Sequence, residues 1–264
     1  MRRVHFIELH EQGWFPSFLR DEVTDALQCA LNRFKAYAPI APLLGRVLDS
    51  TGSRSIVDMC SGGGGPWLEF APKLRGNGRG ALRIQLTDKY PNLRAFQEVR
   101  AASRNQIGFY PGPVDAMDVP RELTGVRTMF TSFHHFRPEQ ARAVLQNAVD
   151  AGQGIAIFEV TRRAASAIGL MFLWALTPFL ITPFIRPLRW SQFFCTYVIP
   201  IIPMVFLFDG VVSCLRTYRV EELREIVAGL TAGEYQWEAG EYAGAAARAP
   251  ITYLIGYPRV CEDN

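Results

Sequence analysis

The sequence predicts an α/β domain built around a mostly parallel sheet, and three observations lead to this expectation. Short apolar runs, such as SIVDMC at 55–60 and GIAIFEV at 154–160, alternate with amphipathic helical stretches. Strands separated by helices are joined by crossover connections, which make neighbouring strands parallel and bury both of their faces. Four consecutive glycines at 62–65 follow the first apolar run, so a ligand can approach the backbone there without meeting Cβ atoms. A length of 264 residues fits a single domain of this kind.

Hydrophobic periodicity assigns the elements in order. Apolar side chains recur every three or four residues over 17–36, which predicts an amphipathic helix, and Pro39 and Pro42 separate it from a shorter helix at 41–48. The last two apolar runs, at 235–242 and 251–258, have no helix between them and are expected to pair as a closing hairpin. The other expected strands cover 82–88, 107–116 and 127–133, and the other expected helices cover 66–74, 92–103, 138–152 and 220–230.

Composition narrows the classes of function. The formal net charge is +3 and no basic tract carries interleaved aromatic residues, so nothing indicates nucleic-acid binding. Five cysteines are scattered without C-x-x-C spacing or neighbouring histidines, which argues against a zinc site and against a disulfide framework. We therefore expect no metal, and a cytoplasmic location. The N-terminal MRRVHFIELHEQ is too polar for the apolar region of a signal peptide.

Aspartates stand at the ends of the first three strands. Asp58 precedes the glycine loop, Asp88 ends the second strand in LTDKY, and Asp115 stands at the end of the third strand in VDAMDVP. The carboxyl ends of parallel strands meet at one edge of the sheet, where open α/β sheets bind their ligands. Asp88 is placed to accept both ribose hydroxyls of a nucleoside, Asp115 to bond an adenine amino group, and Asp58 suits a ligand with a cationic head.

In this order and spacing, the motifs VDMCSGGGG, LTDKYPN, VDAMDVP and MFTSFHHF resemble those of the class I S-adenosylmethionine-dependent methyltransferases, over about residues 55–159. The resemblance implies a Rossmann-like, doubly wound sheet of seven strands with S-adenosylmethionine as cofactor. Cys60 stands where the family's loop usually begins with glycine, so we expect a slightly tighter loop. The alternative is a Rossmann-like domain that binds another nucleotide or no nucleotide. The implied cofactor-binding residues are Asp58, Cys60, Gly62, Gly64, Asp88, Lys89, Asp115, Ala116 and Ser132.

A histidine pair, His134 and His135, follows the fourth strand in MFTSFHHFRPEQ. The resemblance places this segment on the substrate face near the transferring methyl group, and a neutral imidazole can take a proton from an acceptor. We expect at least one of the two to act as a catalytic base or to orient the substrate; alternatively, one ring caps the next helix or packs beneath the loop. Glu159, at the end of the fifth strand, either faces the same cavity or forms a salt bridge with Arg162 or Arg163.

Two uncharged segments, 164–185 and 190–208, interrupt the α/β pattern, with only RPLR between them. The first is long enough to cross a bilayer core of about 30 Å as a helix, but its prolines remove helical hydrogen bonds. Three interpretations remain: a broken helical cap over an apolar pocket, a hairpin lying in one membrane face, or a two-pass anchor. Arginines at the turn disfavour the anchor, because they would lie on the far side of the membrane. The first two interpretations both predict an apolar substrate.

The sequence as a whole favours methyl transfer from S-adenosylmethionine to oxygen or nitrogen of a hydrophobic small molecule or lipid-like metabolite. The alternatives are a non-catalytic nucleoside-binding module that docks on a membrane or partner, and a cofactor-binding enzyme that performs a cyclisation or rearrangement. Trp14 and Phe15 are expected either to close over the pocket and bind substrate or to pack in the core. We expect peripheral membrane contact through 164–208. The expected parts are N-terminal helices at 1–50, a cofactor-binding core at 51–161, a hydrophobic helical insertion at 162–215, and a last helix with the hairpin at 216–264.

Overall fold

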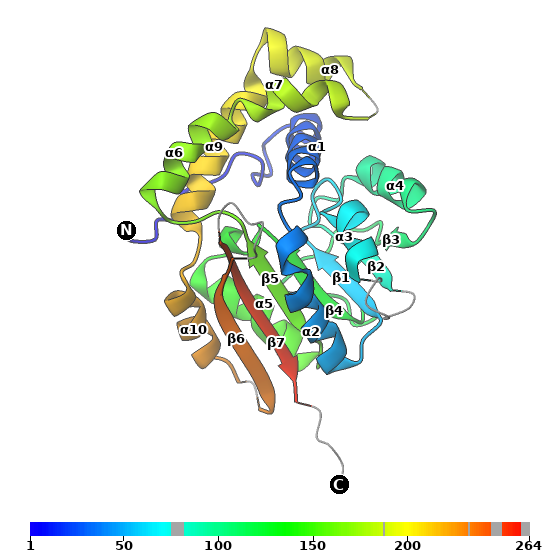
Figure 1. Ribbon diagram of the computed structural model, residues 1–264, viewed down its shortest axis with the longest axis vertical. Helices are drawn as coiled ribbons and strands as arrows, with labels where there is room; N and C mark the ends of the chain where they lie inside the picture. Colours follow the sequence, from blue (N-terminus) through cyan, green and yellow to red (C-terminus); the bar gives the residue numbers. More distant parts are fainter. Residues whose placement is uncertain (75–81, 187, 232, 244–249, 260–264) are drawn as a thin grey trace.

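A seven-stranded sheet forms the centre of the computed structural model, which describes residues 1–74, 82–186, 188–231, 233–243 and 250–259 (Figure 1). The strand order is β3-β2-β1-β4-β5-β7-β6. The strands β1 to β5 pair in parallel, and β7 runs antiparallel to both β5 and β6. This topology confirms the doubly wound, mostly parallel sheet and its closing hairpin. The strands are β1 Ser55–Met59, β2 Arg83–Leu86, β3 Ile107–Phe109, β4 Val126–Phe130, β5 Ile155–Glu159, β6 Tyr235–Tyr242 and β7 Ile251–Pro258.

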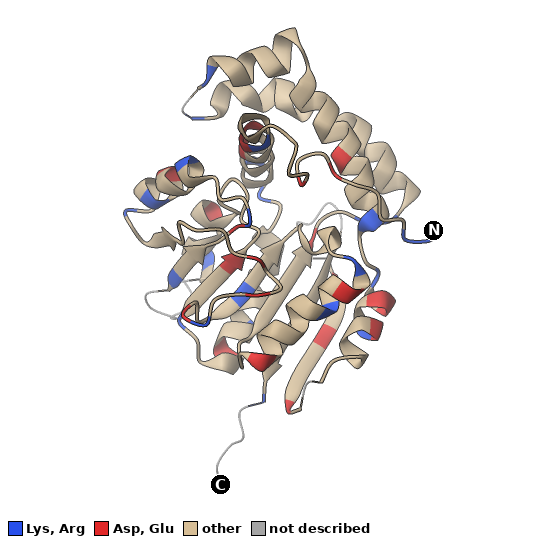
Figure 2. Ribbon diagram, turned by 180° about the vertical axis from the view of Figure 1, so that it is seen from behind, with Lys and Arg blue, Asp and Glu red and all other residues tan. Residues whose placement is uncertain are grey.

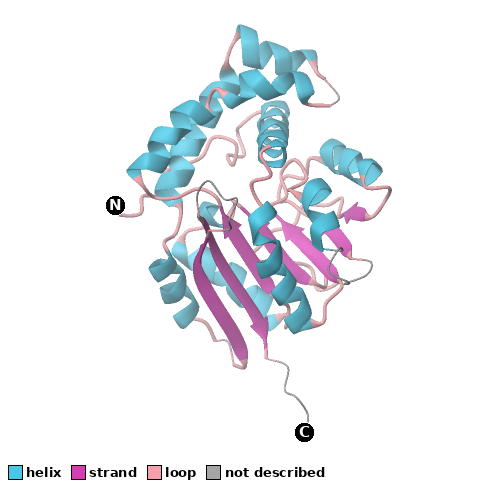
Figure 3. Ribbon diagram, in the orientation of Figure 1, coloured by secondary structure: helices cyan, strands magenta, loops and turns pink. Residues whose placement is uncertain are grey.

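Helices cover both faces of the sheet (Figure 3). Successive strand residues point to opposite faces, so that Ile56 belongs to one apolar core cluster and Val57 to the other. One face packs against α2 (Ala41–Thr51), α3 (Trp67–Leu74) and α4 (Leu93–Ala102), and the other against α5 (Pro138–Asp150) and α10 (Val220–Ala228).

The third strand is shorter than its apolar run suggests. β3 ends at Phe109, whereas the expected strand continued to residue 116. Pro111 and Pro113 have no N–H to donate to a strand ladder, and they flank Gly112, so the sheet pairing stops there. The chain then turns, with Asp115 and Asp118 forming an isolated bridge.

A helical layer lies beyond the carboxyl ends of the strands. The first helix, α1 (Ser17–Arg33), rests on the glycine loop, and the insertion after β5 packs on α1 from the other side (Figure 1). A third apolar cluster joins them, for example Val23 and Ala26 of α1 with Ile202 and Phe206 of the insertion. The insertion is broken into α6 (Ala165–Trp174), α7 (Thr177–Ile181), α8 (Trp190–Phe193) and α9 (Ile201–Arg216).

Part of the insertion is as apolar as a membrane-spanning helix. Within the described residues, one helical run, Ala165–Phe184, is long and apolar enough to cross a membrane, and 28% of its most apolar window is buried in the protein. The following helices, Trp190–Val198 and Ile201–Arg216, pass the same test only together, and they are bent by 73°. The insertion is thus a set of broken helices that packs on α1, and many of its apolar side chains stay exposed. The last expected part is described only to residue 259.

Candidate functional site

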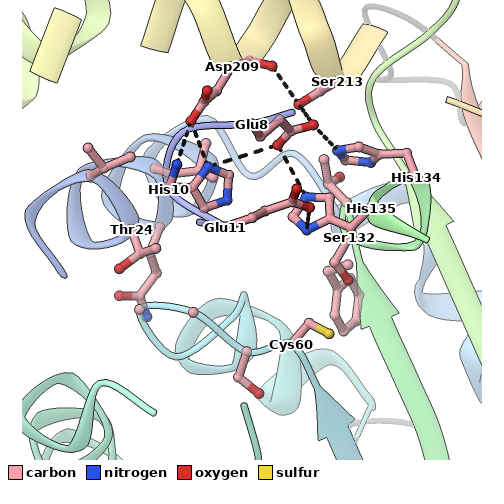
Figure 4. A pocket seen from close by; sticks show the side chains of 18 of the residues that line it. Glu8, His10, Glu11, Thr24, Cys60, Ser132, His134, His135, Asp209 and Ser213 are labelled. Atoms are coloured by element: carbon pink, nitrogen blue, oxygen red, sulfur yellow. Dashed lines mark hydrogen bonds and ion pairs between the residues drawn. The ribbon is translucent and has the colours of Figure 1, made fainter. Parts of the chain in front are cut away.

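The carboxyl ends of the parallel strands open into a cavity of about 620 Å³. The glycine loop forms one side of this cavity, and α1, α6 and α9 enclose it together with the N-terminal segment at 8–12 (Figure 4). Strand-end carboxylates line one end, which we term the cofactor end after the role that the sequence predicts for them. The histidine pair and the N-terminal segment line the other, which we term the acceptor end on the same basis. Both ends open into one continuous space.

The glycine loop depends on backbone conformations that other residues rarely adopt. Gly62 and Gly65 have φ angles of +53° and +64°. A Cβ at Gly63 would lie 2.8 Å from the carbonyl oxygen of Thr24, so α1 rests directly on the loop. Cys60 also has a positive φ, +55°, which is why glycine is favoured at this position. The departure from glycine leaves a strained residue at the start of the loop.

Asp58 is a buried carboxylate at the end of β1. Its Oδ1 accepts a hydrogen bond from the Thr128 hydroxyl at 2.6 Å, and its Oδ2 accepts one from the Ser61 hydroxyl at 2.7 Å. Burial raises the pKa of Asp58 to about 6, and these hydrogen bonds offset only part of that effect. Because Asp58 lines the cavity, a positively charged ligand group beside it would restore its ionised form.

The ends of the second and third strands are tied to the loop. Asp88 accepts hydrogen bonds from the backbone N–H groups of Gly62 and Tyr90, both at 2.8 Å. Burial would raise the pKa of Asp115, but the Met117 backbone N–H, which donates to it at 2.9 Å, and the Lys89 ion pair at 3.0 Å outweigh burial and lower that pKa. The two expected nucleoside contacts therefore lie beside one another at the cofactor end.

Most of the expected cofactor residues line the cavity. Gly64 does not: its φ is +111°, and a Cβ there would lie 2.7 Å from the Val99 side chain in α4. Ser132 is buried, and its hydroxyl has no hydrogen-bond partner within the described part of the chain. The expected residues that line the cavity are Asp58, Cys60, Gly62, Asp88, Lys89, Asp115, Ala116 and Ser132.

His134 lies between two buried carboxylates. Its Nδ1 is 2.8 Å from Glu159 Oε2, and its Nε2 is 3.3 Å from Glu8 Oε1. Burial alone would lower the pKa of His134, but the two carboxylates outweigh burial and raise it to about 10. An imidazole with this pKa already carries a proton near neutral pH and accepts no other. The geometry therefore argues against His134 as a general base.

His135 is the more exposed member of the pair, with 21% of its side chain accessible. Its Nδ1 lies 2.7 Å from Glu11 Oε1, and its Nε2 lies 3.4 Å from Glu8 Oε2. Glu11 is held in turn by both terminal nitrogens of Arg216, at 2.8 and 3.1 Å. Arg216 also donates to the backbone carbonyls of His134 and His135, so it fixes the turn that carries them.

The insertion positions the N-terminal segment. Asp209 in α9 accepts hydrogen bonds from the backbone N–H groups of Leu9 and His10, and its Oδ2 lies 2.7 Å from His10 Nδ1. Burial would lower the pKa of His10, but Asp209 outweighs burial and raises it. Ser213, one turn further along α9, donates to Glu8 Oε1 at 3.1 Å. Figure 4 shows Asp209 and Ser213 at the top of the site, with Glu8 and His10 between them and the histidine pair.

Sequence reasoning missed the acceptor-end residues outside the histidine pair. Glu8, His10 and Glu11 come from ELHEQ, whose only signal is a histidine between two acids. Asp209 and Arg216 come from an otherwise apolar helix, where a lone charge is itself a signal, because an unpaired buried charge is costly.

Three expected substrate contacts lie elsewhere. Glu159 pairs with His134 and does not line the cavity; the expected salt bridge to Arg162 or Arg163 is not formed. Trp14 is 67% exposed, and Phe15 packs in the apolar cluster between α1 and the insertion. Neither aromatic ring lines the cavity, so the lid expectation is not met and the core alternative holds for Phe15.

No protein-family profile matches the chain, and no curated protein matches its sequence. Similar solved structures include the plantazolicin methyltransferase BpumL in complex with SAH, at 11% identity over 96% of this chain and 95% of that one, with a TM-score of 0.59. An O-methyltransferase family protein from Burkholderia thailandensis has 17% identity over 90% of this chain and 60% of that one, with a TM-score of 0.52. A Rhodobacter sphaeroides protein named as a zinc-dependent alcohol dehydrogenase has 13% identity over 90% and 98%, with a TM-score of 0.51. The chain thus has the class I S-adenosylmethionine-dependent methyltransferase fold.

Proposed function

We propose that the chain is an S-adenosylmethionine-dependent methyltransferase acting on oxygen or nitrogen of an apolar small molecule. The observation that carries this proposal is the single cavity that joins the cofactor end to the acceptor end. Methyl transfer needs such a space, because the acceptor atom and the methyl group must be held in line.

The residues at the cofactor end fit S-adenosylmethionine. When bound, this cofactor supplies a methyl group on a positively charged sulfonium. Asp88 would accept the ribose hydroxyls, Asp115 would accept from the adenine amino group, and Asp58 would face the cationic part. The unpaired hydroxyl of Ser132 offers a further polar contact in the same cavity. The likeness to BpumL, solved with SAH, supports this cofactor.

The acceptor is proposed to be largely apolar because the helices α1, α6 and α9 contribute apolar side chains to the cavity wall. Leu27 and Leu31 of α1 face this space, and so do Leu170 and Trp174 of α6 and Phe206 of α9. Apolar ligands gain affinity when such side chains replace water around them. The insertion therefore supplies acceptor specificity, while the sheet supplies the cofactor contacts.

The histidine pair is proposed to orient the acceptor. Both Nδ1 atoms are engaged by carboxylates, which fixes the two rings relative to the cavity. His135 is the one that reaches the accessible part of the cavity, whereas His134 supports it from beneath. Replacing His135 by alanine should lower the turnover number more than it weakens cofactor binding, because its contact is with the acceptor.

We also propose that the outer face of the insertion contacts a membrane surface, from which an apolar acceptor can enter. Leu180 and Phe184 are each 69% exposed and Trp190 is 86% exposed. Figure 2 shows few charged residues over these helices. The exposed Arg186 stands between the two apolar segments, where it suits an anionic lipid headgroup. The proposed location is therefore cytoplasmic and peripheral to the membrane.

Calorimetric titration with S-adenosylhomocysteine tests the cofactor end. Asp88→Ala should weaken binding by roughly tenfold or more, a loss of about 1.4 kcal/mol. Asp118→Ala is the matched control, because Asp118 is exposed and does not line the cavity. An affinity for S-adenosylhomocysteine that Asp88→Ala leaves unchanged would contradict the proposed cofactor site.

Radiolabelled S-adenosylmethionine tests the reaction itself. The protein is incubated with an extract of the source cells, and the products are divided between organic solvent and water. Label in the organic phase supports an apolar acceptor, and label confined to water contradicts it. Binding of S-adenosylhomocysteine without any transfer would favour the alternative, a non-catalytic nucleoside-binding module.

A further inference from the structure

A compact set of side chains at the acceptor end goes beyond what methyl transfer requires. We propose that Glu8, His134 and His135 bind a divalent first-row transition metal ion, of which zinc is the reference case. The proposal revises the expectation of no metal, which rested on cysteine spacing. It concerns binding alone, so it stands apart from the proposed methyl transfer.

The two imidazole rings make two different kinds of contact. On the Nδ1 side, the distances to Glu159 and Glu11 are 2.8 and 2.7 Å, as in charge-assisted hydrogen bonds. On the Nε2 side, His135 lies 3.4 Å from Glu8 Oε2, and His134 lies 3.3 Å from the other oxygen, Oε1. Ligand atoms about 2.05 Å from a tetrahedral zinc ion lie roughly 3.3–3.4 Å from one another. The contact of His135 with Glu8 Oε2 thus has the spacing of two ligands around one ion, and His134 Nε2 lies beside the same carboxylate.

Two of these atoms are buried and make only long contacts. Glu8 Oε2 and His134 Nε2 have no partner with hydrogen-bond geometry within the described residues, and their ion-pair contacts with neighbouring side chains are 3.3–3.9 Å long. A metal ion would satisfy both atoms at bonding distance. One ligand atom from each of Glu8, His134 and His135 lies within 4.8 Å of the others. Ser213 holds the other carboxylate oxygen of Glu8, which leaves Oε2 for the ion.

A carboxylate stands behind each proposed histidine ligand. A Glu159 oxygen accepts a hydrogen bond from Nδ1 of His134, and a Glu11 oxygen accepts one from Nδ1 of His135. Metal-binding histidines commonly donate their second ring N–H to a carboxylate, which fixes the tautomer and directs the lone pair of the other nitrogen at the metal. The same pairs would hold both rings in place for one ion.

The charges of the cluster call for a cation. Four carboxylates, Glu8, Glu11, Glu159 and Asp209, lie around the histidines, and Arg216 is the guanidinium that contacts Glu8 and Glu11. In the metal-free chain the proton on His134 balances part of this negative charge. A divalent ion bound at Nε2 would displace that proton and supply positive charge in its place. Two histidines and one carboxylate form a known donor set for zinc and for ferrous iron.

Three protein ligands leave a further coordination position. All three residues line the cavity, so an oxygen or nitrogen of a substrate can reach an ion held there. A bound ion would then orient the acceptor in place of a base. This consequence, unlike the metal site, rests on the proposed function.

Metal content tests the proposal directly. The purified full-length chain is stripped with a chelator, dialysed against Zn²⁺ and analysed by inductively coupled plasma mass spectrometry, with about one Zn²⁺ per chain expected. Loading with Co²⁺ should give the visible absorption of a cobalt ion with nitrogen and oxygen ligands. Glu8→Gln and His135→Ala should weaken Zn²⁺ binding by at least about 100-fold, and Glu159→Gln by roughly 10- to 100-fold. His5→Ala is the control and should bind Zn²⁺ as the unmodified chain does.

Two results would overturn the metal site. The first is an unmodified chain that retains no Zn²⁺ and shows no cobalt spectrum, a measurement that needs no variant to fold. The second is equal Zn²⁺ binding by the unmodified chain, Glu8→Gln and His135→Ala, which would mark an adventitious ion only. Circular dichroism and affinity for S-adenosylhomocysteine are recorded for every variant. Retained S-adenosylhomocysteine binding without metal would reject the metal site and leave the proposed function standing.

Discussion

Replacing Asp58 by asparagine removes a carboxylate that is only 1% exposed at the cofactor end of the cavity. Burial raises its pKa from 3.8 to about 6, although Thr128 and Ser61 both donate hydrogen bonds to it. That change in pKa corresponds to a cost of roughly 3 kcal/mol for holding Asp58 ionised in the folded protein at neutral pH. Asparagine keeps the shape of the side chain and carries no charge.

The direction of the pH dependence follows from the raised pKa. Between about pH 4 and pH 6 the folded chain binds more protons at Asp58 than the unfolded chain does. The contribution of Asp58 to stability therefore falls as the pH rises through this window, and the loss is complete above it. Asp58→Asn lacks this loss, so its unfolding free energy relative to the unmodified chain should rise by about 1.4 kcal/mol between about pH 5 and pH 7.5.

Urea unfolding of Asp58→Asn and of the unmodified chain, each at about pH 5 and pH 7.5 without ligand, measures this change. The quantity compared is the difference in unfolding free energy between the two proteins at each pH. Asp118→Asn, which makes the same substitution at an exposed aspartate, is the control. The same Asp58→Asn variant should bind S-adenosylmethionine more weakly, because the cationic part of the cofactor loses its carboxylate. A stability difference between variant and unmodified chain that is equal at both pH values would refute the reasoning.

Three further predictions concern other parts of the molecule. Arg216→Gln should lower the unfolding free energy by about 3–5 kcal/mol in urea unfolding, because it leaves the Glu11 carboxylate without its bidentate partner. Gly125→Ala should cost more than about 1 kcal/mol, seen as a lower melting temperature, because Gly125 has a φ of +138° and a Cβ there would meet a backbone oxygen at 2.5 Å. Trp190→Ser should reduce flotation with vesicles that contain anionic lipid, whereas Trp14→Ser, an exposed aromatic outside the insertion, should not.

The cofactor end was predictable from sequence because its chemistry is local. Asp58 and the glycines follow one strand directly, and Asp88 follows the next, so the order of the strands brings them to one edge. At Cys60 the sequence motif predicted only part of what the structure shows. The motif showed a departure from glycine, but only the backbone angle of +55° shows that the cost is strain in that residue.

The acceptor end was not predictable in the same way, because its partners are distant in sequence. Asp209 contacts Leu9 and His10 across about 200 residues, and Arg216 contacts Glu11 across 205. No hydrophobic period relates such positions. The histidine pair was correctly singled out as unusual, but its role as a base was inferred without Glu8, which changes the charge around both rings.

Different parts of the chain build the two ends of the cavity. The cofactor end depends on strand ends and the glycine loop, which the sheet holds in place. The acceptor end depends on α9 holding the N-terminal segment through Asp209 and Ser213, and thereby placing Glu8 against the histidines. If the proposed function holds, substitutions in α6 or α9 can alter the acceptor while the proposed S-adenosylmethionine contacts persist. Loss of the Asp209 contacts should release the N-terminal segment and impair acceptor chemistry first, with the cofactor end unaffected.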